Sequence, residues 1–139
     1  MMRSLRASML REALLKFTRE LSAQLVIRRI DDRGIQVNDQ VHATSIALAP
    51  DRLLGEWRPT PVAELAEDDF ESVLGAEPEL ILLGTGATNI FPPRELTFSF
   101  ARRGIGFEFM DTAAAARTFN VVANEGRRVV AVLYLQEGL

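Results

Sequence analysis

The chain has 139 residues, of which 47% are hydrophobic and 25% are charged, and this composition predicts one globular domain and excludes a disordered or fibrous chain. It contains no cysteine and a single histidine, so disulfides and thiolate nucleophiles are excluded, and neither a metal site nor a catalytic residue is expected. The formal net charge is −3 and no run of about 18 apolar residues occurs, which argues against nucleic acid as the main partner and against a transmembrane segment.

The first 22 residues differ from the rest in charge and in pattern. They hold five basic and two acidic residues, whereas the remainder holds 11 basic and 17 acidic residues. Apolar side chains recur at helical spacing at Leu10, Leu14, Phe17 and Leu21. This spacing predicts an amphipathic helix over about residues 4–21, which fits a surface or partner-packing helix, a mitochondrial targeting segment or a membrane-surface helix. We therefore expect a basic helix in residues 1–22, ahead of an α/β domain at 23–139.

The next part of the chain has the alternating pattern of β-strands. Residues 25–30 and 34–37 are two strand candidates, and the aspartates and glycine between them suit a tight turn. A longer candidate follows at residues 41–49. Three successive strands with short connections predict an antiparallel meander. His42 lies in the third of these strands, where a structural histidine is favoured over a catalytic one.

The following segment is rich in prolines and acids. Trp57, Pro59 and Pro61 predict a loop, and residues 66–75 predict a short helix with an acidic start and a glycine stop. Carboxylates gather here at Glu64, Glu67, Asp68, Asp69 and Glu71. We expect these carboxylates to form a solvated face rather than an acid–base pair.

Strands and helices then alternate to the end of the chain. Strands are predicted at 79–84, 105–110 and 128–135, and helices at about 93–103 and 112–124. Such alternation indicates parallel connections. Together with the meander, it predicts an α/β fold in which βαβαβ units complete a mixed sheet with helices on both faces.

One segment, residues 80–93, is the candidate binding site. Its four large aliphatic residues predict a strand buried on both faces, followed by a turn at Gly84 and Gly86. Pro92 and Pro93 then open a helix whose free N–H groups attract anions. The glycine spacing lacks the third glycine of a dinucleotide fingerprint, so no cofactor is expected. The candidate binding residues are Gly84, Thr85, Gly86, Thr88, Asn89, Phe91, Arg94 and Asp111.

Three roles for this segment remain open at the level of sequence. The glycines and polar side chains suit a purely structural turn. Protein recognition would rely on exposed Ile90 or Phe91, whereas a binding protein or minor enzyme for a small anionic metabolite would rely on Thr85, Asn89 and Arg94.

The order of several fragments resembles the Mth938-like family, formerly a domain of unknown function. The fragments are Ile35–Asn38, Leu82–Gly86, Phe91–Pro93, Gly104–Thr112 and Ala115–Asn120, within a match over about residues 25–135. The resemblance implies a three-layer α/β/α domain. It also implies a non-catalytic protein-interaction domain, since a mitochondrial branch of the family is known as an assembly factor for respiratory complex I, while the bacterial members are largely uncharacterised. Only one of the 16 basic residues is lysine, and this arginine bias favours a bacterial protein over a mitochondrial one. The absence of cysteine fits a reducing compartment, so we expect a cytoplasmic protein.

Overall fold

The structure, a computed structural model, describes residues 6–14, 24–58 and 60–135. Residues 6–14 are helical, which confirms the helix predicted near the N-terminus over its described part. Leu10 and Leu14 lie on this helix and are exposed. The predicted positions Phe17 and Leu21 lie outside the described residues.

The centre of the domain is a mixed sheet of five strands in the order β5-β4-β8-β6-β7. Its strands are β4 (Ile46–Ala49), β5 (Arg52–Glu56), β6 (Leu80–Gly84), β7 (Gly106–Met110) and β8 (Val129–Leu133). Strand β6 is parallel to both of its neighbours, β7 and β8. Strand β4 is antiparallel to β8 and to β5. The predicted α/β class with a mixed sheet is therefore confirmed.

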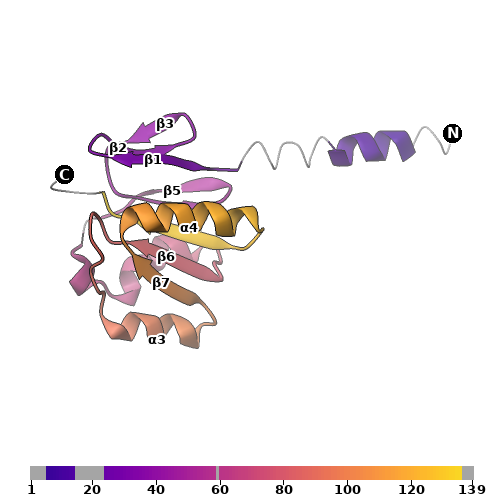
Figure 1. Cartoon of the computed structure of the whole chain (residues 1–139). Coiled ribbons are helices and arrows are strands. Elements are labelled where there is room, and N and C mark those ends of the chain that lie inside the picture. Colours follow the sequence, from indigo (N-terminus) through magenta and orange to yellow (C-terminus); the bar gives the residue numbers. More distant parts are fainter. Residues whose placement is uncertain (1–5, 15–23, 59, 136–139) are drawn as a thin grey trace.

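Two helices cover opposite faces of this sheet. Helix α3 (Arg94–Arg102) connects β6 to β7, and α4 (Thr112–Asn124) returns from β7 to β8 on the far side of β6. The two connections run in opposite directions along the sheet. Because such crossovers are right-handed, they place α3 and α4 on opposite faces, as Figure 1 shows.

Alternating residues of the central strands supply two separate cores. On one face, Leu82 and Phe119 of α4 pack with Ile35 from a second, smaller sheet. On the other face, Ile81 packs with Phe70 and Phe100. That face is covered by α3, by α2 (Glu71–Leu74) and by the short helices η1 (Val62–Glu64) and η2 (Glu67–Phe70). The result is the predicted three-layer arrangement.

The N-terminal meander is a sheet of its own. It consists of β1 (Ile27–Asp31), β2 (Gly34–Val37) and β3 (Gln40–His42), and it lies beside α4 (Figure 1). The predicted strand 41–49 is divided between β3 and β4, and β4 joins the large sheet. Buried Ser45 holds the junction, because its carbonyl accepts from the Trp57 N–H at 2.8 Å and its hydroxyl accepts from the Leu135 N–H at 2.9 Å.

Candidate functional site

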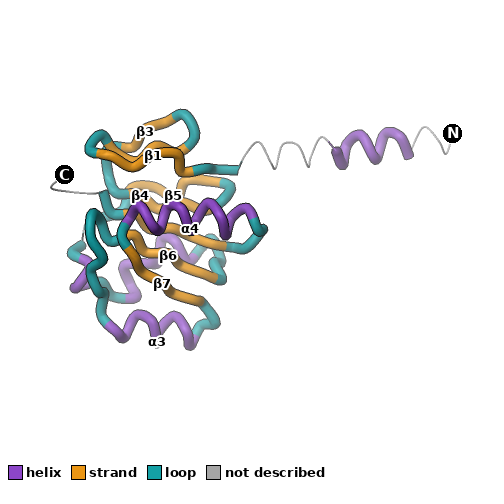
Figure 2. The backbone as a smooth tube through the Cα atoms, viewed as in Figure 1, coloured by secondary structure: helices purple, strands orange, loops and turns teal. Residues whose placement is uncertain are grey.

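The predicted site lies where the chain leaves β6 and β7 toward opposite faces of the sheet. Figure 2 shows the long loop from β6 to α3 as a teal segment. In open α/β sheets such a point usually leaves a crevice for a ligand. The hydrogen bonds of the surrounding residues decide whether such a crevice is open here.

Backbone pairing continues past the end of β6. The Thr85 N–H donates to the Met110 carbonyl at 2.8 Å, and the Thr112 N–H donates to the Gly86 carbonyl at 2.9 Å. The Gly86 N–H donates to Thr112 Oγ1 at 2.8 Å. The same hydroxyl donates to the Tyr134 carbonyl at 2.7 Å. The buried Thr112 side chain therefore occupies the point at which a ligand would meet the glycine turn.

The two glycines serve different purposes. A Cβ on Gly84 would lie 2.9 Å from Thr112 Cα and 3.0 Å from Thr112 Oγ1, so β6 and the start of α4 approach too closely for a side chain. Gly86 has room around it, but its φ of 103° is unfavourable for other residues. Gly84 is thus required by close packing against Thr112, and Gly86 by its backbone conformation.

Thr85 closes the loop on itself. Its hydroxyl donates to the Thr88 carbonyl at 2.6 Å and accepts from the Ile90 N–H at 3.0 Å. Only 3% of the residue is exposed. Asp111 is similarly engaged, because it is the N-cap of α4 and accepts from the Ala114 N–H at 2.8 Å. The Thr85 hydroxyl and one carboxylate oxygen of Asp111 are therefore already bonded within the domain.

The remaining predicted side chains face solvent. Thr88, Asn89 and Arg94 are exposed, and Arg94 is the first residue of α3. Phe91 is 71% exposed and Ile90 is 44% exposed. The Phe91 ring contacts that of Phe109 on β7, with a centroid separation of 5.3 Å and an edge-on geometry. The structure thus brings the predicted residues together, but as an internally bonded turn with an apolar tip.

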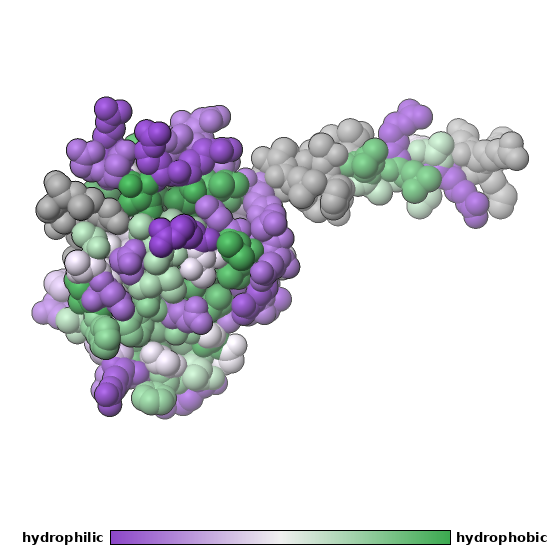
Figure 3. Space-filling view, viewed as in Figure 1, coloured by the Kyte–Doolittle hydropathy of each residue, from purple (hydrophilic) through white to green (hydrophobic). Residues whose placement is uncertain are grey.

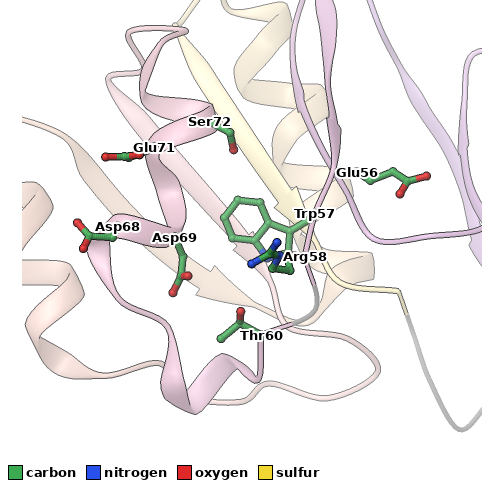
Figure 4. A pocket seen from close by; sticks show the side chains of 8 residues that line it. All are labelled: Glu56, Trp57, Arg58, Thr60, Asp68, Asp69, Glu71 and Ser72. Carbon is green, nitrogen blue, oxygen red and sulfur yellow. The ribbon is translucent and has the colours of Figure 1, made fainter.

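A separate hollow lies beside Trp57 and was not predicted. Its volume is about 540 Å³. In Figure 4, Asp69 and Ser72 extend toward Trp57, Arg58 and Thr60, whereas Glu56, Asp68 and Glu71 point away. A lone tryptophan in a proline-flanked loop beside an acidic segment was the only signal in the sequence.

Polar groups around Trp57 influence one another. The Tyr134 hydroxyl donates to the Thr60 carbonyl. Burial raises the pKa of Tyr134 above its ordinary value of 10.0, while the nearby indole N–H of Trp57 lowers this pKa and Asp69 raises it. The indole N–H of Trp57 is itself buried and has no partner at hydrogen-bonding geometry among the described residues. The hollow is therefore lined by polar side chains that include the Asp69 carboxylate, with neither a histidine nor a cysteine in its lining.

The acidic segment is largely a solvated face, as predicted. Asp68, Asp69 and Glu71 are exposed, and Asp69 caps η2 by accepting from the Ala66 N–H at 2.8 Å. Glu67 differs, because Ser99 of α3 donates to it at 2.6 Å and it also pairs with Arg103. The hydrogen bond from Ser99, followed by the charge of Arg103, lowers the pKa of Glu67. These contacts attach η2 to α3.

In residues 6–14, 24–58 and 60–135, no group of three or more His, Cys, Asp or Glu side chains is arranged to hold a metal ion. Within the same ranges, no helix has the length and apolar character that crossing a membrane requires.

Comparison with known proteins identifies the family. Residues 27–134 match the model of a protein family of unknown function, DUF498/DUF598. The NADH dehydrogenase [ubiquinone] 1 alpha subcomplex assembly factor 3 of Danio rerio is 30% identical over 117 residues, which are 83% of this chain and 67% of that protein. The chain spans 58% to 67% of the length of the first curated relatives that it matches.

Solved structures agree with this assignment. A Xanthomonas campestris protein is 40% identical with a TM-score of 0.72, and the match covers 83% of this chain and 87% of the other. A Bordetella pertussis protein described as an Mth938-like domain is 28% identical with a TM-score of 0.69, covering 81% of this chain and 86% of the other. The chain therefore belongs to the DUF498/DUF598 family and has the Mth938-like fold that its sequence motifs predict.

Proposed function

We propose that this protein is a non-catalytic binding domain with an assembly-factor-like role, and that Ile90 and Phe91 insert into a protein partner. The observation that carries the proposal is the exposure of Phe91, 71% of which faces solvent at the tip of a well-bonded loop. Aromatic side chains held rigidly at a surface are frequent anchors of protein interfaces.

The construction of the loop supports a protein partner over a small anion. The hydroxyl of Thr85 and the N–H groups of Thr85 and Gly86 are bonded within the domain. What remains at the tip is mainly apolar surface, backed by Phe109 and followed by the two prolines that open α3. Because the loop is already ordered, little conformational entropy would be lost on binding.

The relatives support the same class of function. Several of them are named as assembly factors of NADH dehydrogenase. A role of this protein in assembling a respiratory complex is the corresponding specific proposal. We further propose that it acts in the bacterial cytoplasm, since the solved structures that it resembles include bacterial proteins. No reaction is proposed, because neither the loop nor the Trp57 hollow provides a nucleophile with an adjacent base.

The test compares two exposed phenylalanines. Tagged wild-type protein, Phe91→Ala and Phe98→Ala would be expressed in the native host, and co-purifying proteins would be quantified by mass spectrometry. Phe98 on α3 is the matched control, since it is 62% exposed but lies outside the loop. We expect Phe91→Ala to weaken partner binding about 30-fold or more, the effect of losing an interface anchor.

Two outcomes would contradict the proposal. One is a partner that Phe91→Ala retains as well as Phe98→Ala does. The other is a partner or ligand that is lost with Arg94→Ala but not with Phe91→Ala, which would point to recognition of an anion instead.

A further inference from the structure

A second surface, independent of the loop tip, lies between β1 and α4. Here a groove of about 340 Å³ separates the small sheet from the helix, which lie side by side in Figure 1. Ala113 and Ala116 keep the helical side of the groove shallow, and Ile27 and Ile30 provide apolar surface on the strand side. Figure 3 shows this hydrophobic surface with hydrophilic side chains on both sides of it. We call it the β1–α4 groove.

Three arginines border the β1–α4 groove, and a bulge brings two of them together. Ile27 pairs with Val37, and Arg29 pairs with the adjacent Gln36, so Arg28 is an extra residue in β1. In a regular strand, neighbouring side chains would point to opposite faces. Bulges change this direction, and here both Arg28 and Arg29 line the groove.

Asn120 of α4 fixes the bulged strand to the helix. Its side-chain oxygen accepts from the Ile27 N–H at 2.9 Å, and its side-chain nitrogen donates to the Ile27 carbonyl at 2.8 Å. Arg117 lies three residues earlier, on the same side of α4, and contributes the third guanidinium of the groove. The backbone of the bulged strand that carries Arg28 and Arg29 is therefore fixed to the helix that carries Arg117.

The positive charge of the groove has no counterpart in its lining. No carboxylate lines it, and the ion pairs found within the described ranges use Arg52, Arg103 and Arg127 instead. Three like charges around one groove repel each other, and a bound anion would relieve this repulsion. The concentration of charge is notable because the whole chain has a net charge of −3.

We propose that the β1–α4 groove binds a small oxyanion carrying at least two negative charges, of the phosphate or polycarboxylate class. Guanidinium groups match the planar pairs of oxygens that such anions present, and each can donate two parallel hydrogen bonds. The shallow floor formed by the alanines leaves space for the anion between strand and helix. This site does not depend on the loop tip at Phe91, so either proposal can fail without the other.

The test is isothermal titration calorimetry of the full chain at low ionic strength. Pyrophosphate and citrate are the probes of the two classes, and acetate is the singly charged control. We expect one of the two probes to bind at least about tenfold more tightly than acetate, and the tighter probe identifies the class. We expect Arg117→Gln and Arg28→Gln each to weaken that binding about tenfold or more, as loss of a charge-assisted bond would.

Arg52→Gln is the matched control, because Arg52 is exposed on β5 and pairs with the adjacent Asp51. It should change the affinity less than about twofold, the effect expected of a distant screened charge. Circular dichroism would establish that each variant is folded. The proposal is overturned if neither probe binds more tightly than acetate, or if Arg52→Gln weakens binding as much as Arg117→Gln does.

Discussion

Replacing Gly84 with alanine is the most direct test of how the glycine turn works. The added Cβ would lie 2.9 Å from Thr112 Cα, 3.0 Å from its hydroxyl and 3.1 Å from Leu133 Cδ2. Overpacking of this kind costs about 1–3 kcal/mol. Displacing Thr112 would also break its two hydroxyl bonds, each contributing about 1 kcal/mol. Alanine has less conformational entropy than glycine in the unfolded chain, and this offsets about 0.4–1 kcal/mol of the loss. We therefore expect Gly84→Ala to lower the free energy of unfolding by about 2–4 kcal/mol.

The assay is urea denaturation followed by the fluorescence of Trp57, the only tryptophan in the chain and a buried one. Gly75→Ala is the matched control. Gly75 has φ −63° and ψ −19°, and nothing lies within 4 Å of the Cβ that would be added. This change should leave the stability unaltered or raise it by about 0.4–1 kcal/mol. A loss at Gly84→Ala below about 0.5 kcal/mol, the usual range for surface substitutions, would refute the role assigned to Gly84.

Two further predictions concern the groups around this turn. Thr112→Val should lower the free energy of unfolding by about 2–4 kcal/mol, because the buried Gly86 N–H and the Tyr134 carbonyl lose their partner, whereas Thr112→Ser should lower it much less. Urea denaturation would measure both changes, and equal losses for the two variants would contradict the reasoning. Tyr134 is the only tyrosine, so absorbance titration of the folded protein reports its pKa, which should exceed 10.0. Because folding raises this pKa, the contribution of Tyr134 to stability is fully present below about pH 10 and is lost as the pH rises through the higher pKa of the folded state. A titration midpoint of the folded protein at or below 10.0 would contradict the prediction.

Local patterns predicted the C-terminal half of the fold closely. The strand predicted at 79–84 is observed as Leu80–Gly84, and the helix predicted at 112–124 has those limits. Both depend on signals contained in the element itself. A run of aliphatic side chains fits only a strand buried on both faces, and Asp111 supplies the cap that sets the first turn of α4.

The N-terminal half was less predictable because its boundaries depend on distant partners. The continuous pattern of residues 41–49 does not reveal that the strand is divided at Ser45. That division is held by bonds to Trp57 and Leu135, the second of which lies 90 residues away along the chain. Strand β5 was missed for a similar reason. Its sequence Arg52–Glu56 has only two large apolar residues, and its pairing with β4 includes a register shift.

The candidate site could likewise be predicted only where it depends on local residue types. The sequence correctly indicated a glycine turn and an exposed Phe91, since both follow from local residue types. It could not indicate that Thr112 fills the turn, because that requires knowing that the ends of β6 and β8 lie beside the start of α4. Thr112 in this position bonds to both the Gly86 N–H and the Tyr134 carbonyl. The apolar tip at Phe91 and the arginines of the β1–α4 groove are the two surfaces that we propose for binding, and they are of opposite chemical character.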